Sequence, residues 1–375
     1  MECQKKMRLT WAEISLHNLK FNYLNIKKAV GNCSIMAVVK ADAYGHGMVE
    51  VVSALEKLNK KKPNYYGVAL LEEALELRKS KVTSSPILLF APLKMDEITF
   101  YQKYKILPTV ASETELTQLS KFNFKKKLKV HINIDTGMGR VGIPYTNAVN
   151  LILELLNNKM IQIDGIYTHF ATSDERNKKY ANLQLQRFSD IVEKLKEKNI
   201  KTGIIHAANS GAILDIPDSH FDMVRAGISL YGYYPSNETS ESIKLKPVML
   251  LVSEVATVSK VEKGKSISYG RKYKAKSDTK IISVPIGYAD GINRGLTNKM
   301  FCIIKNKKHP QVGTITMDRI MFDVSDAPVK VGDKVILLGN SKNENISAQN
   351  WCKVLKTIPY EITCGISKRV QRKHL

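Results

Sequence analysis

Short apolar runs alternate with longer amphipathic segments through about the first 230 residues, and this alternation constrains the fold more than any other feature. Eight of the runs read as strands: residues 35–39, 65–70, 87–90, 107–110, 128–134, 161–168, 204–207 and 223–230. The segments that read as helices are residues 71–80, 95–104, 113–122, 146–157 and 183–198. Helical crossovers allow successive strands to run parallel, so the repeat predicts an α/β fold with an N-terminal (β/α)8 TIM-like barrel. A doubly wound sheet gives the same local pattern and stays open at this point.

The pattern changes after residues 234–237. Short alternating runs then follow one another between glycines, at residues 249–258, 280–284, 301–304, 311–316 and 334–338. Such runs are typical of a mostly-β domain. We therefore expect residues 1–240 to form the barrel and residues 241–375 to form a β-rich C-terminal domain.

The formal net charge of +23 raises the possibility of a nucleic-acid partner. However, the excess is mostly lysine in surface-like clusters such as residues 60–62, 125–127 and 305–308. No arginine-rich helix, zinc-finger spacing or aromatic RNP-like strand accompanies it. We expect a solvated lysine surface and no nucleic-acid binding, with a basic nucleic-acid-binding protein as the alternative.

Cysteine usage and the opening segment indicate a cytoplasmic protein. The five cysteines include no CxxC pair, which favours reduced thiols over disulfides or a metal site. Residues 1–8 carry charge without a following apolar region, and no run approaches the ~18 apolar residues that a membrane span needs. Cys364 could be a nucleophile, although a small buried core residue is the expected reading.

Lys40 ends the first predicted strand, directly after the apolar run 35–39. A partly desolvated lysine has a lowered pKa, stays nucleophilic and can form a Schiff base with a carbonyl such as that of pyridoxal 5'-phosphate. A lysine that snorkels at a strand end is the ordinary alternative.

Polar clusters coincide with the C-terminal ends of four other predicted strands: residues 135–140, 167–170, 206–211 and 225–229. Taken singly, they could be a turn, a core histidine, a helix N-cap and half of an ion pair. Strand ends of a parallel barrel meet at one mouth, so together with Lys40 they predict a single site.

Two of these clusters suit a phosphate. Asn209 and Ser210, with the amides of Gly227 and Ile228, supply hydroxyl and backbone donors after the last two strands. Arg225 could face a pyridine nitrogen and, because an arginine gives up no proton at neutral pH, would keep that nitrogen unprotonated.

Six motifs together resemble the alanine racemases, fold-type III pyridoxal phosphate enzymes, over residues 8–372. They are residues 38–47 (VVKADAYGHG), 135–140 (DTGMGR), 206–210 (HAANS), 268–270 (SYG), 286–291 (IGYADG) and 316–318 (TMD). The resemblance implies an isomerase that interconverts L- and D-alanine and supplies D-alanine for bacterial peptidoglycan. A racemase of serine or of several amino acids, or a fold-type III decarboxylase, remains an alternative.

The resemblance also implies residue roles. Lys40 would carry the cofactor as a Schiff base, Arg225 would face the pyridine nitrogen, and His169 would lie beside the ring. The phosphate would be held by Tyr44, Ser210, Gly227, Ile228 and Tyr360. Arg140 and the backbone N–H of Met317 would bind the substrate carboxylate.

Inversion at Cα requires a proton to leave one face and another to arrive at the opposite face, so two acid/base groups are needed. The resemblance implies Lys40 on the D-alanine side and Tyr269 on the L-alanine side. In this family Tyr269 and Met317 reach the site from the second subunit, which implies an obligate homodimer.

Three positions depart from the family pattern. Asn133 stands where many members have a carbamylated lysine, and we expect a bound anion or a direct amide contact to orient Arg140 instead. Residues 369–372 read RVQR where RVPR is usual, and Ile292 replaces the usual tryptophan.

Overall fold

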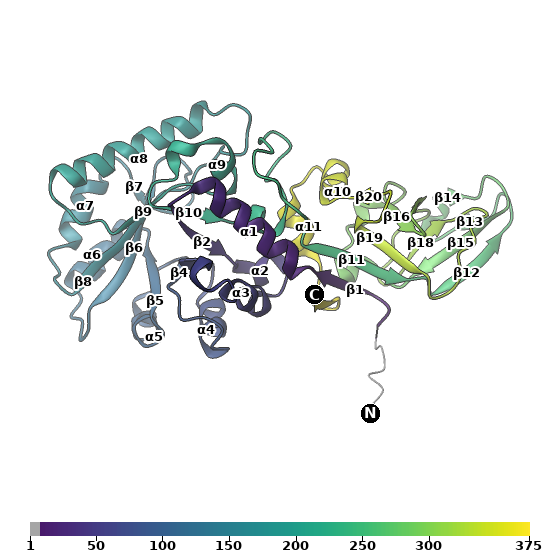
Figure 1. Ribbon diagram of the computed structural model, residues 1–375, viewed down its shortest axis with the longest axis horizontal. Coiled ribbons are helices and arrows are strands. Elements are labelled where there is room, and N and C mark those ends of the chain that lie inside the picture. Colours follow the sequence, from purple (N-terminus) through teal and green to yellow (C-terminus); the bar gives the residue numbers. More distant parts are fainter. Residues whose placement is uncertain (1–7) are drawn as a thin grey trace. The chain divides into compact units, whose positions relative to one another are not determined.

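The computed structural model describes residues 8–375, which divide into two compact units. The barrel unit contains residues 19–43 and 48–246, and the β unit contains residues 8–18, 44–47 and 247–375. Figure 1 traces the chain through both units.

Eight parallel strands follow one another in the sheet of the barrel unit, in the order β10-β2-β3-β4-β5-β6-β8-β9, and the short β7 (Ile143–Pro144) is added beside β6 as a ninth. Their bounds are β2 (Ser34–Val38), β3 (Tyr65–Val68), β4 (Ile87–Pro92), β5 (Ile106–Val110), β6 (Leu128–Asp135), β8 (Ile161–Tyr167), β9 (Ile204–His206) and β10 (Met223–Ala226). The two end strands are joined by single backbone hydrogen bonds, Asp222 N to Ile205 O at 3.0 Å and Arg225 N to Ala208 O at 2.9 Å. The barrel is therefore nearly closed, and the predicted fold class is confirmed.

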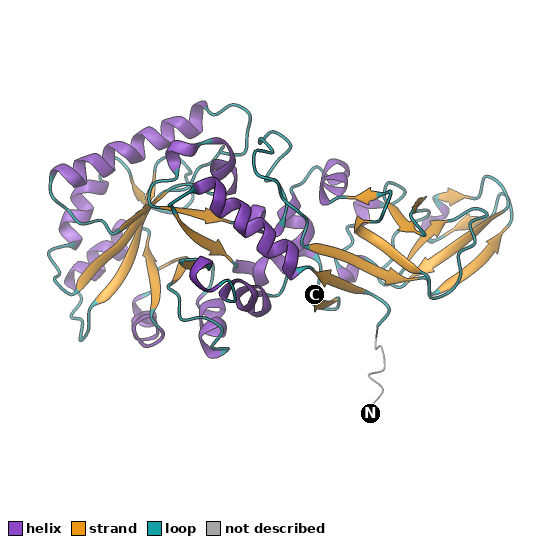
Figure 2. Cartoon of the chain, in the orientation of Figure 1, coloured by secondary structure: helices purple, strands orange, loops and turns teal. Residues whose placement is uncertain are grey.

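Helices connect these strands and lie outside them (Figure 2). They are α1 (Leu16–Val30), α2 (Lys40–Gly45), α3 (Met48–Glu56), α4 (Leu71–Lys79), α5 (Ile98–Tyr104), α6 (Glu113–Lys121), α7 (Ala148–Leu155), α8 (Lys179–Glu197) and α9 (Ser210–Asp215). Helix α8 buries one stripe at helical spacing, made of Ala181, Gln184, Phe188, Ile191 and Leu195. The side chain of Ser112 starts α6 by accepting a hydrogen bond from Glu115 N at 3.2 Å.

The barrel interior is filled by side chains from several strands. One buried cluster joins five of them: Met36, Leu88, Leu107, Tyr167 and Met223. The eighth strand stops at Ala226, earlier than predicted, because the chain turns at Gly227 into the short 3-10 helix η4 (Ile228–Tyr231).

The β unit is built on a seven-stranded sheet with the order β17-β16-β19-β11-β1-β21, to which β20 is added beside β19. The bounds are β1 (Trp11–Ile14), β11 (Met249–Glu254), β16 (Phe301–Ile304), β17 (Lys307–Pro310), β19 (Lys334–Asn340), β20 (Asn345–Ile346) and β21 (Gln371–His374). Smaller sheets and two helices complete it: β12 (Thr257–Val261), β15 (Thr279–Val284), β18 (Ile320–Asp323), β13 (Ser266–Ile267), β14 (Tyr273–Lys274), α10 (Ala348–Leu355) and α11 (Pro359–Gly365).

Strand β1 lies between β11 and β21, antiparallel to the first and parallel to the second. The N-terminal strand therefore belongs to the β unit, whereas the sequence pattern placed it with the barrel. Four residues of local sequence carry no information about which strand will pair with them.

Within residues 8–375, no helix has the length and apolar character needed to cross a membrane. No group of three or more His, Cys, Asp or Glu side chains in this range could hold a metal ion. Cys33, Cys302, Cys352 and Cys364 are not paired in disulfides, and Cys3 lies outside the described residues. Cys364 is exposed, so the expectation of a buried core residue was wrong.

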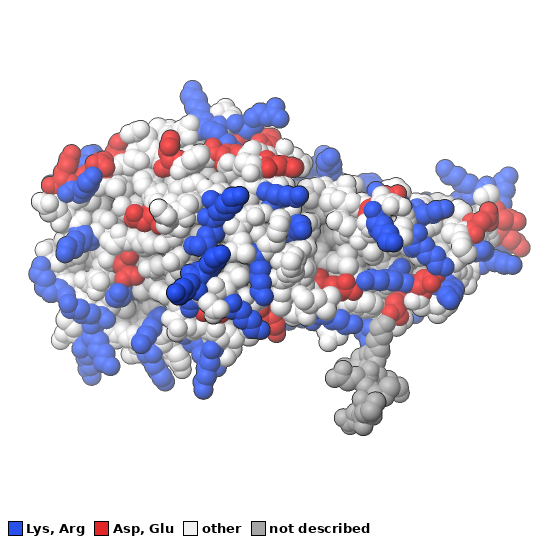
Figure 3. All heavy atoms as spheres, in the orientation of Figure 1, with Lys and Arg blue, Asp and Glu red and all other residues white. Residues whose placement is uncertain are grey.

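Lysine and arginine side chains are spread over the face shown in Figure 3 and are interrupted by acidic ones. The picture shows no single basic stripe on this face.

Candidate active site

Lys40 is the first residue of α2 and follows strand β2 at its C-terminal end. Its Nζ lies 5.9 Å from the centre of the Phe90 ring. The next four residues, 41–44, have φ between +52° and +54°, so this part of α2 is left-handed although none of the four is glycine. Left-handed backbone costs about 1–2 kcal/mol per residue for L-amino acids, and such strain concentrates at functional sites.

Two hydrogen bonds within the barrel unit hold this turn. Ala41 N donates to Glu73 Oε1 at 2.6 Å, and Met48 N donates to Asp42 Oδ1 at 2.8 Å. The backbone directly after Lys40 is thus held by groups that follow it in the sequence.

Arg225, in β10, is a buried guanidinium at the mouth of the barrel. Its Nη1 donates to His206 Nδ1 at 3.0 Å and to His206 O at 3.1 Å. Its Nη2 donates to Thr168 O and Ala207 O, both at 2.8 Å, and lies 3.3 Å from His169 Nδ1. Within the described chain these acceptors are all neutral, and Nε is the one guanidinium nitrogen without a hydrogen bond.

His169 follows β8 and is held by a buried glutamine of α8. Gln184 Nε2 donates to His169 O at 3.1 Å, and Gln184 Oε1 accepts from Ala171 N at 2.8 Å. Burial lowers the pKa of His169 well below its usual value, and the nearby charges of Arg225, Arg140 and Lys40 lower it further. His169 is therefore neutral at neutral pH. Because the charges of Arg225, Arg140 and Lys40 all act on this imidazole, the three cationic side chains lie around it.

Ser210 begins α9 and is buried beside the start of η4. Its Oγ accepts from Gly227 N at 3.0 Å and from Ser229 N at 3.3 Å. A hydroxyl has two acceptor lone pairs and one proton, so the proton of Ser210 is left to donate to another group. Ile228, the first residue of η4, has a backbone N–H with no intrahelical partner. These two donors fit a phosphate, whereas the amide of Gly227 is already engaged with Ser210.

Asn209 caps α9, as the ordinary reading of its cluster predicted. Its Oδ1 accepts from Ala212 N at 3.1 Å and from Ser173 Oγ at 2.8 Å. The loop that follows His169 is thereby tied to the helix that carries Ser210.

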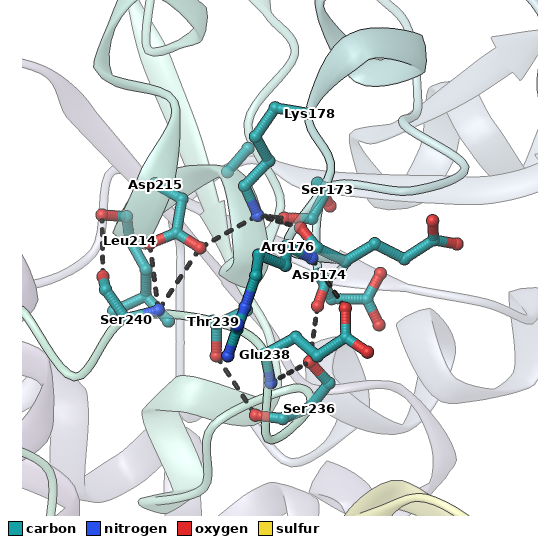
Figure 4. A network of polar contacts seen from close by, with 12 residues as sticks. Ser173, Asp174, Arg176, Lys178, Leu214, Asp215, Ser236, Glu238, Thr239 and Ser240 are labelled. Carbon is teal, nitrogen blue, oxygen red and sulfur yellow. Dashed lines mark hydrogen bonds and ion pairs between the residues drawn. The ribbon is translucent and has the colours of Figure 1, made fainter.

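A polar network anchors the same loop at its far end (Figure 4). Lys178 Nζ lies 3.0 Å from Asp215 Oδ2, at the end of α9, and donates to Ser173 O at 2.8 Å. Asp215 Oδ1 in turn accepts from Ser240 N at 3.1 Å, and Arg176 N donates to Glu238 Oε2 at 2.7 Å. The network joins the loops after β8 and η4 to α9.

The Asp135 cluster is a turn that presents Arg140. Asp135 Oδ1 accepts from Gly137 N and Met138 N at 2.8 Å, and Oδ2 accepts from Gly139 N at 2.9 Å. The Asp135 carboxylate accepts these hydrogen bonds from within the turn, and Arg140 is exposed at the end of the turn.

In the β unit, Tyr44 and Tyr360 lie together, with ring centres 5.8 Å apart and ring planes at 49°. Gly45, the residue after Tyr44, lies close to the helix that carries Tyr360, because a Cβ at this position would lie 2.3 Å from Thr363 O.

Tyr269 and Met317 line a second feature of the β unit, a cavity of about 880 Å³. Tyr269 is 73% exposed and Met317 is 52% exposed. Thr314 Oγ1 donates to Tyr269 O at 2.7 Å, and Ser268 Oγ donates to Thr314 O at 2.7 Å, so the exposed tyrosine stands on a fixed turn. Large exposed apolar side chains beside a cavity are typical of an interaction site.

Two family profiles match the chain: "Alanine racemase, N-terminal domain" over residues 14–235 and "Alanine racemase, C-terminal domain" over residues 248–374. Alanine racemase 1 of Clostridium acetobutylicum is 40% identical over 376 residues, covering 99% of this chain and 96% of the relative. The chain belongs to the alanine racemase family.

Solved structures agree with this assignment. The alanine racemase of Clostridium difficile 630 superposes with a TM-score of 0.92 at 40% identity, over 99% of this chain and 97% of that one. A histidine racemase from Leuconostoc mesenteroides superposes with a TM-score of 0.88 at 26% identity, over 99% of each chain. As a member of the alanine racemase family, the protein is an enzyme of the isomerase class.

Asn133, in β6, is the position at which the sequence predicted an anion or an amide contact in place of a carbamylated lysine. Its Nδ2 donates to Val141 O at 3.0 Å, and its buried Oδ1 has no hydrogen bond within the described residues. The unpaired atom is an acceptor, which attracts a donor such as a guanidinium and repels an anion. Of the two expectations for this position, the geometry favours a direct amide contact over a bound anion.

Sequence reasoning missed His131 and Asp164, and it named His206 only as part of a cluster. His131 Nδ1 lies 3.0 Å from His206 Nε2 inside the barrel, and Asp164 Oδ2 lies 3.8 Å from His131 Nε2. One signal was present: His131 precedes Asn133 by two residues, so both side chains lie on the same face of a strand.

Proposed function

We propose that the protein is an alanine racemase that uses pyridoxal 5'-phosphate, held at the mouth of the barrel, to interconvert L- and D-alanine. The observation that carries the proposal is the arrangement around Arg225. A buried guanidinium hydrogen-bonded only to neutral acceptors lies beside a neutral His169 and near Lys40.

The donor set fits this cofactor. Its attachment point would be Lys40 Nζ, and its phosphate would receive the Ser210 hydroxyl, the Ile228 amide and the hydroxyls of Tyr44 and Tyr360. Asn209 would support this site as the cap of α9, with the Gly227 amide fixing the Ser210 hydroxyl.

When bound, pyridoxal phosphate supplies an electron sink that acidifies the Cα–H of the attached amino acid. Arg225 would direct its remaining Nε–H to the pyridine nitrogen and keep that nitrogen unprotonated. His169, being neutral, would lie beside the ring without adding charge.

The substrate would be held by its carboxylate and handled by two bases. Arg140 and the backbone N–H of Met317 would bind the carboxylate. Lys40 Nζ would take or return the proton on the D-alanine side, and the Tyr269 hydroxyl would do so on the L-alanine side.

We further propose that the enzyme works as a homodimer. Tyr269 is too exposed on the β unit to be shielded from water there, yet an acid/base group acts best where water is excluded. Each β unit would therefore supply Tyr269 and Met317 to the partner's barrel mouth. We place the enzyme in the cytoplasm, providing D-alanine for peptidoglycan, with no nucleic-acid or membrane partner.

Proton exchange tests the two-base assignment. The equilibrium constant between enantiomers is one, so any variant must lose kcat/KM equally in both directions. The exchange of Cα–H with solvent has no such restriction and reports on each base separately.

In Tyr269→Phe, racemisation should fall by about 10²–10⁴-fold, the usual worth of a positioned acid/base group. D-alanine should still exchange its Cα–H through Lys40 in heavy water, while L-alanine should not. Proton NMR with chiral analysis measures both. Equal exchange of the two enantiomers would contradict the assignment, and a wild-type protein that neither binds the cofactor nor racemises alanine would end the proposal.

A broader amino-acid racemase is the second candidate. The histidine racemase of Leuconostoc mesenteroides shares the fold at a TM-score of 0.88, so the architecture accommodates larger side chains. Comparing kcat/KM for alanine, serine and histidine decides between them, because a dedicated alanine racemase should favour alanine by at least about tenfold per added group.

A further inference from the structure

Four ionisable side chains form a chain through the interior of the barrel unit. Arg225 Nη1 lies 3.0 Å from His206 Nδ1, and His206 Nε2 lies 3.0 Å from His131 Nδ1. The other nitrogen of His131, Nε2, is buried with no hydrogen bond inside the described chain, and Asp164 Oδ2 lies 3.8 Å from it. The four residues come from β10, β9, β6 and β8.

The direction of every proton in this chain is fixed by Arg225. A guanidinium only donates, so His206 Nδ1 must accept and the proton of His206 must be on Nε2. That proton points at His131 Nδ1, which must also accept, so the proton of His131 is on Nε2 and points toward Asp164. Protonating either ring would place two N–H groups face to face, so both histidines are neutral.

Asp164 is the carboxylate that lies against this chain, whereas the acceptors of Arg225 in the described structure are carbonyls and imidazoles. Contact with His131, and then with Lys129, lowers the pKa of Asp164 to about 2. A cation at the barrel mouth and an anion at the far end therefore polarise two neutral imidazoles in the same direction.

Local backbone features accommodate this chain. A Cβ at Gly165 would lie 2.5 Å from His131 Cε1, so only glycine leaves room for the ring. The pairing of β6 with β8 slips by one residue at this point, matching Val130 with Ile163 and His131 with Gly165. Asp164 is the extra residue of the resulting bulge, and bulges commonly re-aim a side chain.

We propose that His131 and Asp164 are positioning residues for Arg225: the chain from Arg225 through His206 and His131 to the Asp164 carboxylate fixes the guanidinium so that its Nε–H faces the cofactor ring. The inference rests on the proposed function only for what Arg225 faces. The tautomers follow from the protein alone.

The first experiment uses the wild-type enzyme, as purified, with ¹⁵N-labelled histidine. Long-range ¹H–¹⁵N NMR correlations identify which ring nitrogen carries the proton. We expect both His131 and His206 as Nε2–H tautomers with no charged form between pH 6 and 8. A proton on Nδ1 of either ring, or an imidazolium in this range, overturns the proposal whether or not the protein proves to be an alanine racemase.

The second experiment compares Asp164→Asn with Tyr65→Phe in the holoenzyme. Both variants alter the far end of the chain, but Tyr65 contacts Asp164 from the side, at 3.5 Å, and is not a link. In Asp164→Asn we expect kcat to fall about tenfold with KM within about twofold, because only the ring electronics change. The cofactor absorbance band should shift in its pH titration, and Cα–H exchange of both enantiomers should slow equally.

Asp164→Glu, which restores the charge, should recover most of the loss. The positioning role is overturned if Asp164→Asn loses no more kcat than Tyr65→Phe. It is also overturned if reduced cofactor content explains the loss of kcat in both variants. If the wild-type enzyme fails to racemise alanine, the proposed function fails while the tautomer result still stands.

Discussion

At the scale of single residues, burial decides charge. His131 and His206 are fully buried, and burial is the first cause that lowers the pKa of each. Below about pH 6.5 the unfolded chain binds protons that the folded chain does not, so stability falls as the pH falls, by up to ~1.4 kcal/mol per pH unit for each histidine. The lowered pKa of Asp164 acts only near pH 2–4 and does not enter this window. We expect the free energy of unfolding, measured with urea, to decrease from pH 6.5 to 5. In His131→Gln its dependence on pH should be weaker than in the wild type, by the equivalent of about one bound proton. An unchanged slope would show that His131 is protonated in the folded state.

At the scale of elements, close backbone approaches position the loop that carries Met317. Tyr288 N donates to Thr316 O at 3.0 Å and Ala289 N to Met317 O at 3.1 Å, and a Cβ at Gly287 would lie 2.2 Å from both carbonyl oxygens. Gly287→Ala must therefore displace Met317, whose N–H we propose for the substrate carboxylate. We expect KM for alanine to rise by roughly ten- to a hundredfold, the usual effect of a displacement near 1 Å, with cofactor content unchanged. Gly365→Ala is the matched control, because a Cβ there meets nothing within 4 Å. Steady-state kinetics with both variants test this, and equal KM values would remove the loop from substrate binding.

At the scale of the whole molecule, the proposed dimer places Lys40 and Tyr269 of different subunits in one site. Lys40→Ala and Tyr269→Phe should each be inactive as homodimers. After the two are unfolded together and refolded, half of the dimers should be mixed, and each mixed dimer should have one site with both native residues. Activity should then return to about a quarter of the wild-type value, a consequence of two-fold symmetry. Racemisation by the refolded mixture, compared with each variant refolded alone, measures this. A mixture as inactive as its components would mean that each site is built from one chain.

The sequence by itself determined the repeated strand–helix pattern, the mostly-β second unit, and the segments that carry Lys40, His169, Ser210 and Arg225. These depend on periodicity and on short motifs, which are local properties of the chain. The turn after Lys40 was not predictable in the same way, because residues 41–44 contain no glycine to indicate left-handed backbone.

Only the tertiary structure decided which distant residues meet. It placed β1 between β11 and β21, brought His131 to His206 across 75 positions, and used a one-residue bulge to turn Asp164 toward His131. Strand order and register depend on packing between segments far apart in the chain. For this reason Lys40 could be recognised from its own neighbours, whereas the chain of side chains that orients Arg225 became visible only inside the closed barrel.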